Sequence, residues 1–467
     1  MTAPHRYRPS WTVEEFILAC ANGPVDESRL LMLMGSRGEG KTTGWLWACL
    51  RLAERLREQG RGAALPVRVG VVRDTWTNIE RALSVDALVL SPSGWLKARD
   101  VSVGDWLITE DGQPTQVLGV YAQPERPLWR VCFSDGTSAR VTAGHLWAVE
   151  GRWDRECPGP RTRRCPRLGW LPAANGRRIV RTDQLRERLE HTRRRKLAWT
   201  VPLVAPVQFA PRPVPVDPYL LGVLLGDGGL SQPSIRLTTA DAEVLASVRS
   251  CLPQGVSAKA VAGAKYDYRL VGTRGRSNPL LDALRRLGLW GRRSPDKFIP
   301  DDYLWNDCGT RLRLLQGLMD TDGSASRDKH CCFTSSSERL IEGVEFLVRS
   351  LGGLTRPRGI RRFAPGEGHL KGTHWIRHRV PGLKVTIQLP AGMIPFTLPR
   401  KAVRLVGRRR QPRRFIMRIE PAGHGPAVCF KVNHPSGLFV MQDFVLTHNT
   451  ALETLKEQRQ KGLRIDL

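Results

Sequence analysis

The sequence predicts a mainly β domain that is split by an inserted α+β domain and preceded by an α/β fragment. Three observations lead to this division. A glycine-rich loop near residue 35 lies between a strand-like and a helix-like segment, strand-rich blocks open at Ala82 and close at Asn449, and two apolar helices ending in Asp-Gly lie between those blocks. The predicted boundaries are 1–81, 82–205, 206–405, 406–449 and 450–467.

The bulk composition is typical of a globular chain with several domains. The 467 residues are 41% hydrophobic and 25% charged, which is enough for two to four cores. No apolar run is long enough to span a membrane, and the N-terminus lacks a signal core, so we expect a cytoplasmic protein. The ten scattered cysteines favour neither a zinc site nor a disulfide framework, although Cys157 and Cys165 leave a metal site open.

The net charge of +29 is concentrated in one part of the chain. Residues 1–81 carry +3 and residues 450–467 carry +1, which leaves +25 for residues 82–449. A basic excess of this size favours a polyanionic partner, most simply DNA, over a solvated basic surface. The arginine-rich stretch 151–200 is expected to be an added DNA-contact arm, with a solvated helix as the alternative.

The N-terminal segment contains a P-loop pattern, G-x-x-x-x-G-K-[ST], between a buried strand and a helix. Glycines let backbone N–H groups turn toward phosphates, and the helix N-terminus adds positive potential. Lys41 is expected to reach the outer phosphates and Thr42 to bind magnesium; a chance loop is the alternative. The candidate nucleotide-binding residues are Gly35, Gly40, Lys41 and Thr42.

Residues 1–81 resemble the opening of phage terminase large subunits, the packaging ATPases. The resemblance covers only about 80 residues, and no second acidic strand follows to complete the ATPase. ATP and its magnesium are therefore expected to bind only in the completed host protein.

The two ends of the chain form one helix when the middle is removed. Residues 450–467 read as a helix fragment without a domain of its own, and they continue the helix that is interrupted after Arg81. An apolar stripe runs along the joined helix through Ile79, Ala451, Leu452 and Leu455. This continuity indicates that Ala82 to Asn449 is an insertion.

The inserted sequence resembles inteins, self-splicing proteins of the Hint (horseshoe) fold that is shared with hedgehog autoprocessing domains. The resemblance is carried by the opening block ALSVDALVLSPSGWLKARDVSVGDWLI, by Thr142 and His145 in ARVTAGHLWAVE, and by the terminal His448-Asn449 before a hydroxyl residue. Most inteins begin with a Cys or Ser nucleophile, whereas this one begins with Ala82.

An intein class without the first nucleophile, often called class 3, explains this departure. The class carries a dispersed Trp, Cys and Thr, which match Trp147, Cys429 and Thr447 in position. Taken alone, Cys429 would be read as a small buried residue and Trp147 as core packing. Asp86 in the opening block is either structural or catalytic, and His434 matches no motif position.

The class implies a first step at the upstream junction. The Cys429 thiolate attacks the carbonyl carbon of Arg81, because a thiol is the best side-chain nucleophile at neutral pH once its pKa is lowered. His145 protonates the departing nitrogen of Ala82, and Thr142 helps to hold that peptide.

The resemblance also implies the later steps. The Thr450 hydroxyl takes the acyl group, Asn449 cyclises to a succinimide with the help of His448, and the ester to Arg81 rearranges to a peptide bond. No ATP or metal is needed for splicing.

The middle of the insert resembles LAGLIDADG homing endonucleases. The helices in PYLLGVLLGDGGL and RLLQGLMDTDGSA are expected to pack closely at Gly222 and Gly317 and to bring Asp227 and Asp322 together. Two carboxylates at one place can hold Mg²⁺ between scissile phosphates. Asp227 and Asp322 are therefore the predicted metal ligands and catalytic acids.

The two halves of this region also read as repeats. Lys297 and Lys401 each follow an acidic helix end and are expected near the active centre; a plain phosphate contact is the alternative for Lys401. Two copies in one chain imply a monomer that reads a long asymmetric site on double-stranded DNA, with sheets in the major groove. The expected target is the host gene without the insert.

Three other functions compete with this interpretation. The first is a terminase-like packaging ATPase fragment that carries an insert defective in splicing or DNA cleavage. The ATPase part of this alternative explains only residues 1–81. A Hint domain that only cleaves does not explain the rejoined helix, and a DNA-binding module with dead catalysis does not explain intact Asp227 and Asp322.

Overall fold

The computed structural model describes residues 81–151, 177–191, 199–326, 331–356, 368–371, 374–377, 382–405 and 411–448. All of them belong to a compact unit formed by Ile79–Leu452, while Met1–Asn78 and Glu453–Leu467 form a second unit. The predictions for the P-loop, Cys157, Cys165, Asn449 and Thr450 lie outside the described residues. In the described ranges, no helix combines the length and apolarity needed to cross a membrane.

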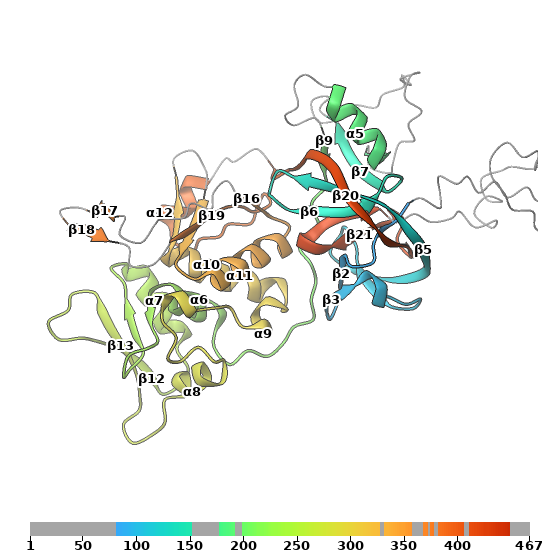
Figure 1. Cartoon of the computed structure of the whole chain (residues 1–467). Helices are drawn as coiled ribbons and strands as arrows, with labels where there is room; N and C mark the ends of the chain where they lie inside the picture. The colour runs from blue at the N-terminus through green and yellow to red at the C-terminus, as the bar shows by residue number, and fades with distance from the viewer. Residues whose placement is uncertain are drawn as a thin grey trace, which may run out of the picture. The chain divides into compact units, whose positions relative to one another are not determined.

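Both ends of the insert build one β domain (Figure 1). Its strands are β1 (Leu83–Ser84), β2 (Leu88–Ser91), β3 (Gly94–Lys97), β4 (Trp106–Ile108), β5 (Pro114–Phe133), β6 (Ser138–Thr142), β7 (Leu146–Gly151), β8 (Arg178–Arg181), β9 (Trp199–Val201), β20 (Arg414–Val432), β21 (Leu438–Met441) and β22 (Val445–His448). Its helical segments are η1 (Ala98–Asp100), α5 (Thr182–His191) and η6 (Gln442–Phe444).

The pairing of these strands places the start of the insert in the middle of a sheet. The larger sheet has the order β4-β5-β6-β1-β20-β9-β7-β8, and β5 also pairs with β20. The short strand β1 lies between its two partners, because Leu83 pairs with Val141 on β6 and with Val428 on β20. The chain just after the upstream junction is therefore fixed between the strands that carry Thr142 and Cys429.

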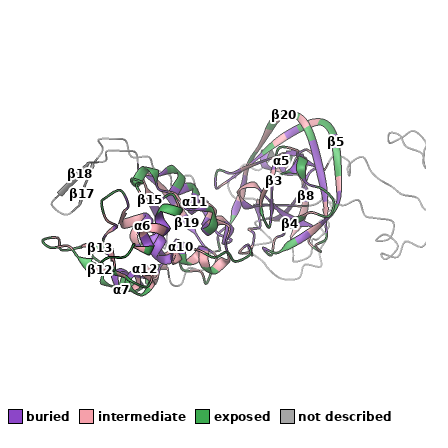
Figure 2. Cartoon of the chain, turned by 90° about the horizontal axis from the view of Figure 1, so that it is seen from below, coloured by how far each residue is buried: buried purple, intermediate pink, exposed green. Residues whose placement is uncertain are grey.

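The long strands β5 and β20 form the frame of this domain. Buried and exposed residues mix along β5 and along most of β20, which Figure 2 shows on both ribbons, as expected for strands with one face on the core. Residues 427–430 of β20 are all buried. Several register shifts interrupt their pairing, and such irregularities bend a strand and increase its twist. A second sheet, β22-β21-β2-β3, completes the domain with the downstream end of the insert.

The basic stretch predicted as an added arm is partly built into this domain. Strand β8 pairs with β7, and Val180 and Leu185 are fully buried in the β-domain core. In the described part, residues 177–191 therefore form a packed strand and helix rather than a separate arm. The β-domain core also extends to Phe209, past the boundary expected at residue 205.

The α+β domain between these parts consists of two similar halves. The first contains α6 (Pro218–Asp227), β10 (Gly228–Gly229), β11 (Arg236–Thr238), α7 (Ala242–Cys251), β12 (Val256–Ala260), β13 (Asp267–Gly272), α8 (Pro279–Arg286), η3 (Ser294–Asp296) and α9 (Asp301–Leu304). The second contains α10 (Cys308–Thr321), β14 (Gly323–Ala325), β15 (Cys331–Ser335), α11 (Glu338–Ser350), β16 (Leu354–Arg356), β17 (Gly368–Lys371), β18 (His374–Arg377), β19 (Leu383–Gln388), α12 (Pro399–Ala402) and η5 (Val403–Leu405).

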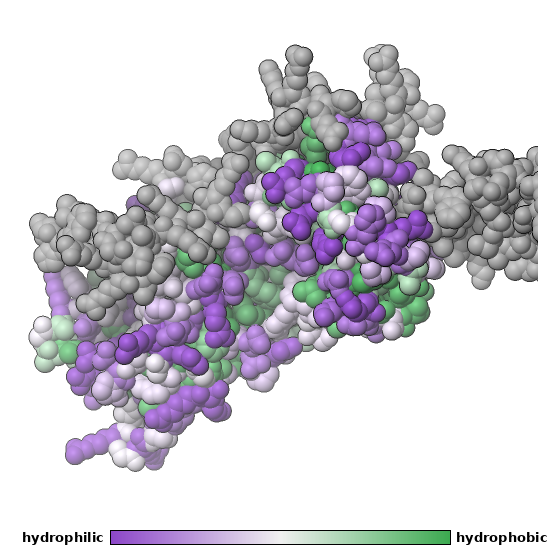
Figure 3. All heavy atoms as spheres, in the orientation of Figure 1, coloured by the Kyte–Doolittle hydropathy of each residue, from purple (hydrophilic) through white to green (hydrophobic). Residues whose placement is uncertain are grey.

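Each half has a four-stranded sheet that follows its long helix. The orders β10-β11-β13-β12 and β14-β15-β19-β16 are equivalent, so the predicted repeat is confirmed. Figure 3 shows hydrophilic side chains over much of the described surface on the side that it draws, while the apolar side chains of both halves share one core.

Helix α6 begins and packs as its sequence indicates. The Asp217 side chain accepts hydrogen bonds from the backbone N–H groups of Tyr219 and Leu220, at 2.9 and 3.1 Å, and Pro218 occupies the first turn. All residues from Tyr219 to Leu225 are buried. A helix that is apolar on every side belongs in the interior, and α6 packs there against α10.

Two glycines set the distance between α6 and α10, as the sequence predicts. A Cβ added at Gly222 would lie 2.3 Å from the Leu314 carbonyl oxygen, and one at Gly317 would lie 2.3 Å from the Tyr219 carbonyl oxygen. Neither distance is compatible with a side chain, so the helices touch backbone to backbone. The prediction of close packing at this pair is confirmed.

Replacing Gly317 with alanine is expected to destabilise the fold by about 2 kcal/mol or more, because separating the helices costs more than the gain in helix propensity of about 1 kcal/mol. Urea unfolding of the full chain carrying Cys429→Ala and Asn449→Ala, which removes two of the predicted reacting groups, measures the change. Glu342→Ala, at an exposed position of α11, is the control and should alter stability by less than about 0.5 kcal/mol. Equal stability of the two variants would contradict the close contact.

Candidate splicing and nuclease sites

Thr142 holds both polar backbone groups of Ala82, the first residue of the insert. The Ala82 N–H donates to Thr142 Oγ1 at 2.9 Å, and the Thr142 hydroxyl donates to the Ala82 carbonyl oxygen at 3.1 Å. The Thr142 N–H donates to the same carbonyl at 2.9 Å. The residue that follows the upstream junction is therefore fixed, and it is 1% exposed.

The Cys429 thiol lies beside that residue. Ala82, Ala427 and Cys429 form a small buried cluster of their own, because β1 and β20 are paired neighbours. Arg81, His145 and His448 line the same pocket as Ala82 and Cys429. Cys429 is not part of a disulfide. The two sides of the upstream junction thus face a thiol and two imidazoles.

His145 is buried and linked to the downstream end of the insert. Its Nε2 lies 2.5 Å from Thr447 Oγ1, whereas its buried Nδ1 has no hydrogen-bond partner among the described residues. Burial, followed by the charge of the nearby His448, lowers the pKa of His145 to about 3. The imidazole is therefore neutral at pH 7 and can give a proton from one nitrogen while accepting at the other.

Trp147 and Thr182 hold His145 in place. The Trp147 ring meets the imidazole edge-on, with the ring centroids 5.2 Å apart. Its Nε1–H donates to Thr182 Oγ1 at 3.0 Å, and the Thr182 hydroxyl and N–H donate to the His145 carbonyl at 3.1 and 2.9 Å. No motif predicts Thr182; its place at the start of a helix in RTDQL is the only sequence signal for it.

The other candidates near the splicing motifs lie elsewhere. Asp86 forms a surface ion pair with Arg99 and is not among the lining residues of the junction pocket. His434 lies 3.6 Å from an Asp111 carboxylate oxygen and lines a different pocket, of about 510 Å³. Of the predicted splicing residues in the described ranges, Thr142, His145, Trp147, Cys429, Thr447 and His448 therefore gather, and Asp86 does not.

Asp227 and Asp322 meet where α6 and α10 end. A Cβ added at Gly226, next to Asp227, would lie 3.4 Å from Asp322 Oδ2. Asp322 is an exposed residue, yet desolvation of its carboxyl group and then the Asp227 carboxylate raise its pKa to about 6. Two like charges this close favour a proton or a cation between them, so the donor set fits a hard divalent ion.

Lys297 and Lys401 cap the two helices in the same way. Lys297 Nζ donates to the carbonyls of Leu224, Leu225, Gly226 and Gly228 at 3.1, 2.9, 3.2 and 2.7 Å. Lys401 Nζ donates to those of Met319, Asp320, Thr321 and Gly323 at 3.0, 2.7, 3.5 and 2.7 Å. Burial lowers the pKa of both lysines, that of Lys297 to about 8. Both amines are held at the helix ends that carry the acids.

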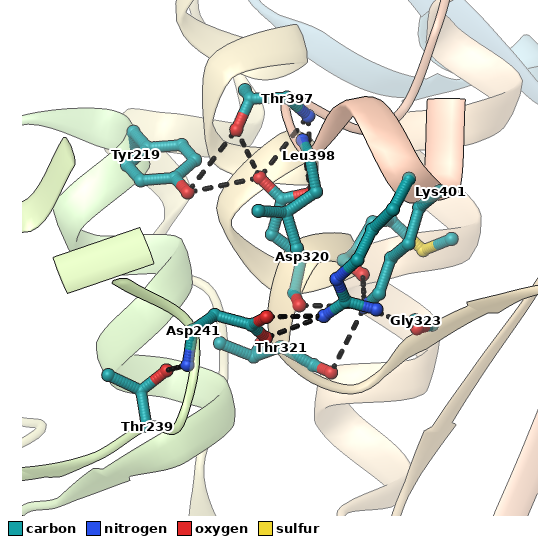
Figure 4. A network of polar contacts seen from close by, with 11 residues as sticks. Tyr219, Thr239, Asp241, Asp320, Thr321, Gly323, Thr397, Leu398 and Lys401 are labelled. Atoms are coloured by element: carbon teal, nitrogen blue, oxygen red, sulfur yellow. Dashed lines mark hydrogen bonds and ion pairs between the residues drawn. The ribbon is translucent and has the colours of Figure 1, made fainter. Parts of the chain in front are cut away.

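Asp320 anchors the segment that carries Lys401 (Figure 4). Its buried carboxylate accepts hydrogen bonds from Tyr219 Oη at 3.0 Å, from the Thr397 N–H at 3.1 Å and from the Leu398 N–H at 3.3 Å. These bonds fix the start of α12, from which Lys401 projects. The endonuclease resemblance, which pointed to Asp322, does not predict this role for the acid two residues earlier.

The comparisons with known proteins match both parts of the insert. Residues 309–369 match the family described as LAGLIDADG-like domain. The chain is 29% identical over 386 residues to the replicative DNA helicase DnaB of Mycobacterium intracellulare, covering 80% of this chain and 59% of that protein. It is 37% identical over 70 residues to DnaB of Mycobacterium leprae, covering 15% and 12%. The chain thus spans less than two thirds of either relative.

Solved structures with local similarity include the Msm DnaB1 intein splicing domain bound with zinc, at 43% identity over 15% of this chain and 54% of that one, with a TM-score of 0.15. They also include I-DmoI in complex with its target DNA, at 16% identity over 37% and 88%, with a TM-score of 0.23.

The relatives correct the expected host. Both are replicative DNA helicases, so a terminase-like host is not supported. That resemblance rested on a strand, a phosphate loop and a helix, a pattern that unrelated functions share. The family match and the geometry of the junction support an enzyme that combines an intein splicing domain with a LAGLIDADG-type endonuclease domain.

Proposed function

We propose that this chain excises residues 82–449, joins Arg81 to Thr450, and releases an insert that cuts DNA at host genes lacking it. One observation carries the splicing proposal. The Ala82 backbone is hydrogen-bonded to Thr142, and the Ala82 side chain packs against Cys429. This arrangement puts a nucleophile beside the junction even though residue 82 has none.

In the first step, Cys429 Sγ bonds to the carbonyl carbon of Arg81, and the bond from that carbon to the Ala82 nitrogen breaks. The thiol proton ends on the new Ala82 amine, carried by His145, which is neutral at pH 7. The Thr142 hydrogen bonds keep the Ala82 nitrogen in place as it leaves. The product is a thioester on Cys429.

In the later steps, the Thr450 hydroxyl attacks the thioester, which forms an ester and returns the thiol of Cys429. The side-chain nitrogen of Asn449 then attacks its own carbonyl carbon, making a succinimide and releasing the Thr450 amine. His448, the preceding residue, assists this cyclisation. The freed amine attacks the ester, and the acyl group of Arg81 moves to nitrogen as a peptide bond.

The nuclease proposal rests on Asp227 and Asp322 at the paired helix ends. These two carboxylates would hold Mg²⁺, which when bound stabilises the attacking and leaving oxygens of a phosphate displacement. Lys297 and Lys401 keep the two helix ends in position. The two equivalent sheets suit a monomer that reads both halves of one duplex site in the major groove.

DNA cleavage should fall as the pH drops through about 6. The pKa of Asp322 is raised to about 6, so the carboxyl group is protonated below this pH and metal binding is lost. The raised pKa also affects folding. In the unfolded chain Asp322 ionises near its ordinary pKa of about 3.9, so its contribution to the free energy of unfolding falls as the pH rises from about 4 to 6. Single-turnover cleavage at one fixed, subsaturating Mg²⁺ concentration between pH 5 and 8 measures the effect, because saturating metal would displace the proton. A rate independent of pH over this range would exclude the role of Asp322.

The host part is a separate proposal. The relatives favour a replicative DNA helicase as the interrupted protein, and nucleotide binding at Gly35, Gly40, Lys41 and Thr42 remains a prediction for the joined host.

Mass spectrometry of the expressed chain tests splicing directly. Splicing yields a free 368-residue insert and a 99-residue ligated product. Intact precursor, or two separate host fragments without ligation, would contradict the proposal. Incubating the free insert with a duplex that joins the codons of Arg81 and Thr450 tests the nuclease.

A further inference from the structure

A strained turn precedes the strand that leads to the downstream junction. Asp443 and Phe444 have φ angles of 58° and 56°, in the left-handed region that side chains other than glycine rarely adopt. Strand β22 follows at once and carries Thr447 and His448. Two consecutive strained residues persist only where surrounding contacts hold them.

The guanidinium of Arg414 supplies such contacts from within the β domain. It is fully buried, and it donates from Nη1 to the Phe444 carbonyl at 2.8 Å and from Nη2 to the Asp443 carbonyl at 2.9 Å. Its Nε donates to Asp135 at 2.7 Å. Although burial raises the pKa of Asp135, Arg414 and Thr137 bring it below its usual value, so the pair is ionised. Both carbonyls of the turn are therefore tied to one fixed cation.

Helix α11, in the second half of the α+β domain, contacts the same turn through its side chains. The Arg349 guanidinium donates to the Asp443 carboxylate at 2.9 Å. The Phe346 ring packs edge-on against the Phe444 ring, with centroids 5.2 Å apart. Arg414 thus binds the backbone carbonyls of the turn, and side chains of α11 bind its side chains.

We infer that Arg414 is a positioning residue for cleavage at the downstream junction, and that Arg349 and Phe346 of α11 are a second support for it. The inference rests on the proposed splicing reaction. By fixing the turn, these residues fix the register of β22, and with it His448, the residue before the downstream junction. The Cys429 step at Arg81 relies mainly on the pairing of β1 with β6 and β20. It meets β22 through the contact between His145 and Thr447, so it should depend on the turn less than the downstream cleavage does.

Arg414→Met should slow succinimide formation on the order of tenfold to a hundredfold, as small displacements of reacting groups do. Thioester formation at Cys429 should slow less than succinimide formation, so the branched ester at Thr450 should accumulate on denaturing gels. Arg414→Lys keeps the charge and one hydrogen bond and should restore part of the rate. Arg349→Met should act in the same direction with a smaller effect.

Arg418→Met is the matched control, because Arg418 lies on the same strand with an exposed side chain, and it should splice at the parental rate. Equal slowing of both junctions by Arg414→Met would indicate general destabilisation and overturn the inference. Unchanged downstream cleavage would overturn it as well.

Amide hydrogen exchange separates this inference from the splicing proposal. In a precursor blocked by Cys429→Ala and Asn449→Ala, Arg414→Met should raise exchange in Val445–His448 by at least about tenfold and leave Val141 and Thr142 protected. Suppose that Arg414→Met speeds exchange in Val445–His448 but the unsubstituted chain does not splice. The role of Arg414 in positioning β22 would then stand, and the splicing proposal would be rejected. If exchange is unchanged by Arg414→Met although the unsubstituted chain splices, only the positioning role of Arg414 would be rejected.

Discussion

Replacing Cys429 with alanine is expected to leave the precursor unspliced. The thiol is the side-chain nucleophile beside Ala82, and loss of a nucleophile typically lowers a rate by at least about 10³-fold. The substitution removes one sulfur atom from a buried site, so the fold should be retained. Gel analysis and mass spectrometry of the expressed chain should show full-length protein with neither the free insert nor the ligated product.

Cys132→Ala is the control for the Cys429 substitution. Cys132 is also a free cysteine, on the neighbouring strand β5, and its loss should leave splicing intact. Ligated product from Cys429→Ala would refute the assignment of the nucleophile. Ala82→Gly should splice, because residue 82 contributes only backbone groups; complete loss there would show that residue 82 is not chemically passive.

Replacing Asp322 with asparagine is expected to abolish DNA cleavage while the duplex still binds. The amide has the shape of the carboxylate but not its charge, so the metal site loses one of its two anionic ligands. Because desolvation and then repulsion from Asp227 raise the pKa of Asp322, the neutral side chain should also raise the Tm slightly. A cleavage assay with Mg²⁺, a gel-shift assay and thermal unfolding measure the three effects.

Asp282→Asn is the control for this prediction, because Asp282 is a half-buried acid on α8 that pairs with Arg285. It should cut like the parent. Cleavage by Asp322→Asn at the parental rate would exclude the paired acids as the active centre. Loss of DNA binding together with cleavage would point to a folding defect instead, which the Tm measurement detects.

The sequence predicted the parts of the fold that depend on local pattern. Gly222 and Gly317 stand midway along apolar helices, where a missing side chain has few explanations other than close packing. Likewise, Asp227 and Asp322 end equivalent helices, so their meeting follows once the helices pair. Thr142, His145, Cys429 and Thr447 gather as expected because the matching strands are neighbours in the sheet.

What the sequence could not predict depends on contacts between distant segments. Arg414 forms an ion pair with Asp135, which is nearly 280 residues away in the sequence, and Asp320 accepts a hydrogen bond from Thr397, 77 residues away. Neither pair leaves a periodic or motif signal. Lys297 and Lys401 were expected near the acids, but their position as caps on backbone carbonyls depends on loop geometry that composition does not encode.

The burial of Ala82 has a consequence for the direction of the proposed reaction. Cleavage at Arg81 turns the Ala82 nitrogen into an amine that stays against Thr142 and beside the new thioester. A buried amine resists protonation, so it remains able to attack the thioester and restore the original peptide. The first step is therefore reversible within the folded site. The cyclisation of Asn449 is the step that makes excision of the insert irreversible.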